Sequence, residues 1–225
     1  IGLYAWVYQN ARYLWIASSR ENSPLPANLQ GQWNDNLDCN MGWTNDYHLV
    51  INTQQNYWLS NIGNLHETNM PLFSDIKELS IHGQKTARNY GSKGWTANTI
   101  ANVWGYTPSG AGVNWGLFPL ASTWIASHLW THYNYTLDRS FLREEAYPLL
   151  KGNAEFILNF MIEDSKSGYL MTGPSTSPEN SFRYKGAELS LSMMQSCDRQ
   201  LAHAAFTAWI EASEILDIDT DSREE

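Results

Sequence analysis

Glu179 is the carboxylate that stands out in this sequence, because its local segment is built to hold a side chain still. The segment runs from Thr172 to Phe182, and Pro174 and Pro178 bracket Ser175-Thr176-Ser177 within it. Each proline fixes its own φ and pushes the preceding residue toward extended geometry. A carboxylate in such a loop is either a site residue with a perturbed pKa or an ordinary residue at a helix N-terminus, stabilised by the macrodipole. The local pattern leaves both interpretations open.

A second group of polar residues consists of His48, Asn52 and Gln55. We expect a helix from Thr44 or Asn45 to about Asn61, and on it these residues fall at i, i+4 and i+7. Because the rest of this segment is rich in Tyr, Ile and Trp, the polar stripe either lines a cavity or forms the outer face of the helix.

Composition excludes several classes of function. The 225 residues contain 14 Lys and Arg against 23 Asp and Glu, so the chain lacks the basic surface that nucleic-acid backbones require. No apolar run approaches the roughly 20 residues of a membrane-spanning helix. Cys39 and Cys197 are the only cysteines, too few for a disulfide scaffold and without a metal-type spacing. We therefore expect no nucleic-acid partner, no membrane span, no metal and no cofactor.

Aromatic residues are unusually frequent, with 11 Trp and 12 Tyr, while charged residues make up only 16%. Flat rings with a polar edge suit protein cores, and they also suit stacking on sugar rings in wet clefts.

The hydrophobic periodicity predicts a mostly helical protein. Two long segments rich in Asn, Gly, Pro and Trp interrupt the helices, from Glu21 to Trp43 and from Ser92 to Gly116. Long ordered loops of this kind usually serve a site. A short strand or extended run is expected near Leu170, and Asp138 is expected to cap a helix. The predicted helices cover residues 3–19, 45–61, 70–90, 117–135, 138–145, 146–162 and 189–216.

Paired helices with aromatic loops at alternate junctions indicate a solenoid or a closed α/α toroid. No short sequence repeat marks an open array, so the toroid, or part of one, is favoured. The first residue is Ile1 and the last residues are charged, so we interpret residues 1–225 as a single domain excised from a longer protein.

Several stretches together resemble the catalytic domain of glycoside hydrolase family 95, the α-L-fucosidase family that acts on 1,2-linked fucose. They extend over nearly the whole chain in order: Asn28-Leu29-Gln30-Gly31-Gln32-Trp33-Asn34, Asp46-Tyr47-His48 to Asn52, Gln55-Asn56-Tyr57-Trp58, Leu149-Leu150-Lys151-Gly152, Gly168-Tyr169-Leu170, and Ser175-Thr176-Ser177-Pro178-Glu179-Asn180. The resemblance implies an all-α (α/α)6 barrel, of which this chain would be the N-terminal half with about six helices. The rest of the same barrel would then be its structural partner.

The resemblance also assigns roles to individual residues. Glu179 matches the general acid of the family, Asn52 matches one of two asparagines that hold and polarise the catalytic base, and His48 matches a residue that contacts the sugar. The family pattern has Asn-x-Asn where this chain has Val50-Ile51-Asn52, so the first asparagine is replaced by a hydrophobic residue. The catalytic aspartate of the family lies downstream of these residues. Asp198 also fits a family position, and we interpret it as a structural residue that bonds from a helix to a loop.

The implied chemistry explains these residue types. In an inverting glycosidase a protonated carboxyl gives its proton to the leaving oxygen, while a second carboxylate about 6.5 to 9.5 Å away activates water. The free pKa of a glutamic acid is about 4.3, so Glu179 needs an upward pKa shift, which desolvation in a tryptophan-rich cleft can provide. Trp33, Trp104 and Trp115 are candidates for a wall that stacks on the sugar, with core packing as the alternative role for each.

Two functions of different class follow. The first is a hydrolase that removes terminal α-linked L-fucose, or the similar L-galactose, from oligosaccharides or from plant or host glycans. The second is a non-catalytic glycan-binding helical domain that has lost base activation at Val50. We expect Val50→Asn to raise turnover by restoring the second amide, and we expect a protein that is secreted or periplasmic in a bacterium, with its signal peptide outside this sequence.

Overall fold

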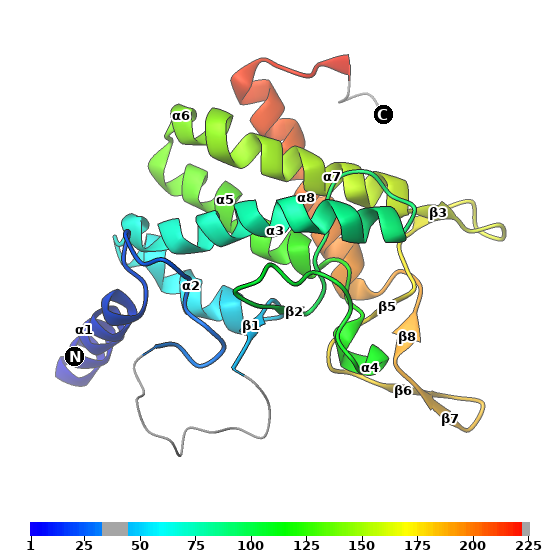
Figure 1. Cartoon of the computed structure of the whole chain (residues 1–225), viewed down its shortest axis with the longest axis horizontal. Helices are drawn as coiled ribbons and strands as arrows, with labels where there is room; N and C mark the ends of the chain where they lie inside the picture. Colours follow the sequence, from blue (N-terminus) through cyan, green and yellow to red (C-terminus); the bar gives the residue numbers. More distant parts are fainter. Residues whose placement is uncertain (33–44, 222–225) are drawn as a thin grey trace.

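The computed structural model describes residues 1–32 and 45–221, and within these ranges the chain is mostly helical (Figure 1). Six helices of more than ten residues account for most of the described structure, as the sequence predicts. They are α1 (Gly2–Ser18), α2 (Asn52–Ile62), α3 (Met70–Asn89), α5 (Ala121–Thr136), α7 (Tyr147–Phe160) and α8 (Ser196–Leu216). Shorter helical segments are η2 (His66–Asn69), α4 (Val113–Gly116), α6 (Arg139–Phe141) and the π-helical turn η3 (Leu142–Ala146).

The core lies around α5, which contacts α2, α3, α7 and α8. Several apolar side chains of α3, α5 and α7 are fully buried, and those of α3 and α5 recur at helical spacing. They include Leu72, Ile76 and Leu79 from α3, Ile125 and Leu129 from α5, and Phe156 and Ile157 from α7. Figure 1 shows the consequence, with α3, α5 and α7 side by side and α8 behind them.

Three observations on the helices bear on the sequence predictions. Asp138 caps α6 as expected, because its carboxylate accepts hydrogen bonds from the backbone N–H groups of Ser140 (2.9 Å) and Phe141 (3.1 Å). The two helices predicted on either side of Glu145 form one continuous helical segment, in which η3 connects α6 to α7. Most apolar side chains of α1 are exposed within the described residues, including Tyr4 and Val7.

Within residues 1–32 and 45–221, eight strands of two or three residues form four antiparallel pairs, β1 with β2, β3 with β4, β5 with β8 and β6 with β7. They lie below and to the right of the helices in Figure 1. Their bounds are β1 (Tyr47–His48), β2 (Ile100–Ala101), β3 (Ile162–Glu163), β4 (Leu170–Met171), β5 (Ser175–Thr176), β6 (Phe182–Tyr184), β7 (Ala187–Leu189) and β8 (Leu191–Ser192). The extended run expected near Leu170 is β4.

Three predicted helices start later than expected. The helix predicted from residue 117 begins at Ala121. The helix predicted from Thr44 or Asn45 begins at Asn52, because Tyr47 and His48 pair with β2 and Ile51 has a positive φ of 59° that ends any helical path. Consequently His48 is not on the same helix as Asn52 and Gln55. The helix predicted from Leu189 begins at Ser196. Residues Lys185 and Gly186, both with positive φ, instead turn the chain from β6 into β7 as a hairpin.

Among the described residues, no helix combines the length and the apolar content needed to cross a bilayer.

Asp75 on α3 provides a test of the packing by pH. Its Oδ2 atom is buried without a hydrogen-bond partner among the described residues, and burial, with a smaller contribution from Glu78, raises the pKa of Asp75 to about 7. The pKa of Asp75 is higher in the folded protein than in the unfolded chain. The stability of the fold that depends on a neutral Asp75 is therefore fully present below about pH 4 and is lost as the pH rises through 7. We expect Asp75→Asn, which stays neutral, to be more stable than wild type by on the order of 2 to 4 kcal/mol at pH 8 and nearly equal at pH 4.

Thermal melting at both pH values measures this difference. Glu78→Gln is the matched control, since it removes only the smaller charge contribution from an exposed side chain on the same helix. An Asp75→Asn variant that melts below wild type at pH 8, or that has the same advantage at pH 4, would contradict the prediction.

Candidate active site

Four of the six predicted site residues line one cleft of about 540 Å³. They are His48, Asn52, Trp115 and Glu179, which come from parts of the sequence more than a hundred residues apart at the extremes. The remaining lining residues are Leu29, Asp46 and Ile100. The cleft therefore combines an aromatic ring, two carboxyl groups, an imidazole and an amide, and its described lining contains no Lys or Arg.

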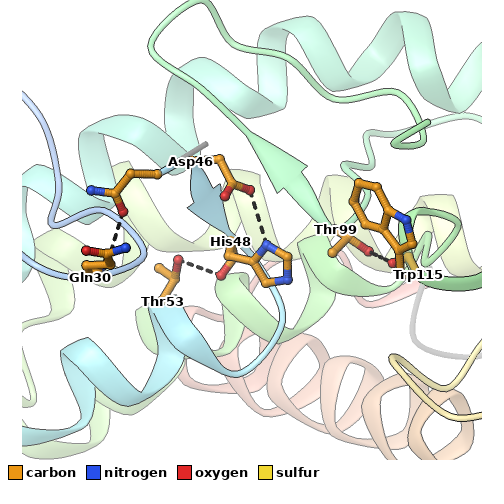
Figure 2. A network of polar contacts seen from close by, with 7 residues as sticks. Gln30, Asp46, His48, Thr53, Thr99 and Trp115 are labelled. Carbon is orange, nitrogen blue, oxygen red and sulfur yellow. Dashed lines mark hydrogen bonds and ion pairs between the residues drawn. The ribbon is translucent and has the colours of Figure 1, made fainter. Parts of the chain in front are cut away.

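The pairing of β1 with β2 positions His48. His48 lies opposite Ile100 in this ladder, and the next residue, Leu49, donates its backbone N–H to the carbonyl of Thr99 over 2.7 Å. The Thr99 hydroxyl in turn donates to the backbone carbonyl of Trp115 over 2.8 Å (Figure 2). The backbone positions of His48 and Trp115 are thereby fixed relative to one another through Thr99, the residue that precedes β2.

A strained turn between β1 and α2 positions Asn52. Ile51 has φ 59° and ψ −41°, and the N–H of Asn52 donates to the carbonyl of Val50 over 2.8 Å, the geometry of a rare γ-turn. For a β-branched residue this conformation costs on the order of 1 to 3 kcal/mol and persists only where the surroundings enforce it. Here the side chains of Thr53 and Gln54 donate to the carbonyls of His48 (2.8 Å) and Leu49 (2.9 Å). These bonds hold Asn52 at the first turn of α2, beside the cleft.

Val50 itself is 7% exposed and belongs to the hydrophobic core. Val50 precedes the first residue of α2 and is not helical, although the sequence predicts a helix over residues 45–61. We expect this substitution to lower stability by about 1 to 3 kcal/mol, because it buries an amide in an apolar surrounding. The gain in turnover expected from the family pattern stays a prediction, to be measured on the same variant.

Val50→Ala is the matched control for Val50→Asn, since it removes volume without adding a polar group. Urea unfolding of both variants separates the two effects. An Asn variant as stable as wild type, with higher turnover, would show that the amide leaves the core and reaches the catalytic base.

The three predicted stacking tryptophans separate in the structure. Trp115 lines the cleft, half-buried, with its ring against the backbone of Gly110 and Gly112, where a Cβ would meet ring atoms at 2.8 and 2.1 Å. Trp104 does not line it. Trp104 is 82% exposed and borders a separate pocket of about 340 Å³ beside α3. Trp33 lies outside the described residues.

Glu179 projects from a loop that is fixed at its base. The N–H and hydroxyl groups of Thr176 both donate to the carbonyl of Leu117, over 3.0 and 2.9 Å, and the Gln195 side chain donates to the carbonyl of Ser175 over 2.7 Å. No helix begins directly after Glu179 in the described structure, because the chain continues into β6. The alternative of a helix N-terminus is therefore wrong for this residue. Glu179 is exposed among the described residues, so these residues do not provide the desolvation that an acid catalyst needs.

Asp198, in the first turn of α8, anchors this loop from below. It is fully buried, and its carboxylate accepts hydrogen bonds from the hydroxyls of Thr172 (3.1 Å) and Ser175 (3.3 Å). Burial raises the pKa of Asp198 to about 6, and the two hydroxyls oppose that shift. The prediction of a structural residue that bonds from a helix to a loop is confirmed.

Sequence reasoning missed Asp46 as a site residue. Its Oδ2 atom lies 3.1 Å from Nδ1 of His48, and its side chain is only 8% exposed (Figure 2). The predicted helix placed residues 46 and 48 on different faces, whereas in an extended chain residues i and i+2 share one face. An alternation of polar residues before Leu49 was the available signal.

Comparison with known proteins gives a consistent result. All of residues 1–225 match the family described as the glycosyl hydrolase family 95 catalytic domain. The chain is 41% identical over 219 residues to "Alpha-L-fucosidase 2" of Arabidopsis thaliana, covering 96% of this chain and 26% of that protein. It is 37% identical over 179 residues to "Probable alpha-fucosidase A" of Aspergillus niger, covering 77% of this chain and 22% of that protein. The chain thus spans about a quarter of the length of these curated relatives.

Proposed function

Because this chain belongs to the glycosyl hydrolase family 95 catalytic domain family, we propose that the protein hydrolyses terminal α-L-fucosides, or the similar L-galactosides, of glycans with inversion at the anomeric carbon. The observation that carries the proposal is the single cleft in which His48, Asn52, Trp115 and Glu179 meet. Two relatives with fucosidase names support fucose as the sugar.

In this proposal Glu179 is the general acid that protonates the leaving oxygen. Asn52 orients and polarises the catalytic base, which lies outside the 225 residues, without adding a positive charge that would lower its basicity. Trp115 offers an aromatic face to the sugar. The remaining part of the protein would complete the cleft around Glu179 and bury its carboxyl group.

We further propose that the helices belong to an (α/α)6 barrel whose other half covers them. The exposed apolar side chains of α1 support this, because a helix with apolar residues over most of its surface requires burial on several sides. The six long helices of the described residues are about half of the number that such a barrel contains.

The experiment that tests the function is hydrolysis of an oligosaccharide with a terminal α-1,2-linked L-fucose by the full-length protein, followed by proton NMR. An inverting enzyme releases β-L-fucose first, and the α anomer appears only by slow mutarotation. Initial release of α-L-fucose would refute inversion. Binding of the oligosaccharide without any release of fucose would favour the alternative, a glycan-binding domain that has lost base activation at Val50.

A further inference from the structure

Asp46 and His48 form a pair inside the proposed substrate cleft. Nδ1 of His48 lies 3.1 Å from Oδ2 of Asp46, and the two side chains are 17% and 8% exposed, respectively. Both residues line the cleft that contains Asn52 and Glu179. Figure 2 shows the carboxylate directed at one edge of the imidazole.

Backbone hydrogen bonds fix both members of the pair. The carbonyl of Asp46 accepts from the N–H of Leu29 over 2.9 Å, and the carbonyl of His48 accepts from the Thr53 hydroxyl over 2.8 Å. The pairing of β1 with β2 holds His48 in an extended chain, in which residues i and i+2 share one face, so Asp46 lies on the same side as His48. These contacts therefore fix the position of the imidazole before any ligand binds.

The carboxylate determines which nitrogen of the imidazole carries the proton. An ionised carboxylate only accepts hydrogen bonds, so Nδ1 of His48 must be the protonated nitrogen that donates to it. In the neutral ring the other nitrogen, Nε2, is then left as an acceptor on the opposite edge. A hydroxyl group is the donor that such a nitrogen would meet in a sugar-binding cleft whose described lining contains no Lys or Arg.

We infer that Asp46 is a positioning residue, which fixes His48 so that its Nε2 atom accepts a hydrogen bond from a hydroxyl group of the bound sugar. This inference rests on the proposed function, because it takes a sugar as the ligand of the cleft. The Asp46 side chain is less exposed than that of His48, 8% against 17%, and its carboxylate faces the imidazole, so Asp46 acts through the imidazole rather than on the sugar.

A double-mutant cycle in the full-length protein tests the inference. We expect Asp46→Ala to lower kcat/KM on an α-L-fucoside by about 10- to 100-fold, mostly through KM, because the imidazole loses its fixed tautomer and orientation. Asp46→Asn keeps an oxygen that can accept from Nδ1, and it should recover most of the loss. In a His48→Ala background, Asp46→Ala should cost little further.

Inhibition by free L-fucose provides a readout of binding that is independent of turnover, and its inhibition constant should rise in parallel with KM. Asp164→Ala is the control, since Asp164 is an exposed carboxylate that accepts a hydrogen bond from Ser167, outside the cleft. Thermal melting of each variant separates loss of folding from loss of function.

The outcomes separate the inference from the function on which it rests. A wild-type protein that neither cleaves nor binds fucosides would refute the proposed function itself. An active wild type in which the losses from Asp46→Ala and His48→Ala add up independently would refute only the role of Asp46. The same holds if Asp46→Asn is as impaired as Asp46→Ala while it melts at the wild-type temperature.

Discussion

Glu179→Gln in the full-length protein should reduce turnover on a fucosylated glycan by about 10² to 10⁴-fold while KM changes little. Glutamine keeps the shape and most of the hydrogen-bonding capacity of glutamic acid, but it cannot deliver a proton to the leaving oxygen.

Glu188→Gln is the matched control for Glu179→Gln. Glu188 is an exposed glutamate on the neighbouring strand β7, where its carboxylate accepts a hydrogen bond from Ser181 over 2.6 Å, and it does not line the cleft. We expect kcat/KM of Glu188→Gln to stay within about twofold of wild type. If both variants lose activity equally, the effect belongs to the loop as a whole and not to proton transfer from Glu179.

Asp198→Ala is the second substitution with a large expected effect, on stability and on activity together. It removes the carboxylate that accepts from the buried hydroxyls of Thr172 and Ser175, although Ser175 keeps the carbonyl of Thr176 as a second acceptor at 3.2 Å. The loss of a buried hydrogen bond of this kind costs about 1 to 3 kcal/mol. The loop that carries Glu179 would then shift, and a displacement of about 1 Å can cost roughly 10²-fold in rate. We expect urea unfolding to show a free energy of unfolding that is lower by about 2 to 4 kcal/mol. We also expect kcat to fall by roughly 10²-fold.

Asp138→Ala distinguishes this effect from a general loss of a carboxylate. Asp138 also accepts two hydrogen bonds, but it caps α6 at the surface and does not line the cleft, so its removal should cost about 1 kcal/mol without a change in kcat/KM. An Asp198→Ala variant with wild-type activity would show that the loop holds Glu179 in place without this anchor.

The long helices could be predicted because their signals are local. In α3 the apolar residues repeat at helical spacing and a proline sits in the first turn, and both features lie within twenty residues. The pairing of β1 with β2 could not be predicted in the same way. Tyr47 and Ala101 are separated by more than fifty residues, and strands of two residues leave no periodicity to detect. Long-range pairing therefore overrode the local preference of residues 45–51 for a helix.

The same physical difference explains which site residues were found. The prolines and the family pattern identified Glu179, His48 and Asn52, and the abundance of tryptophan made Trp115 a candidate. The structure brings these four residues to one cleft. Trp104 does not line the cleft, because its segment folds into a tight turn. In this turn Oδ1 of Asn102 accepts hydrogen bonds from the backbone N–H groups of Trp104 (3.0 Å) and Tyr106 (3.2 Å). Nothing in the spacing of the tryptophans could indicate this turn.

The dependence of the Glu179→Gln loss on the leaving group tests the account most directly. The variant and the wild type are compared on a natural fucosylated oligosaccharide and on an activated aryl α-L-fucoside, whose departing oxygen needs little protonation. If Glu179 is the general acid, the loss of kcat/KM on the aryl fucoside should be smaller than the loss on the oligosaccharide by roughly tenfold or more. Equal losses on the two substrates would contradict the assignment of Glu179 as the general acid.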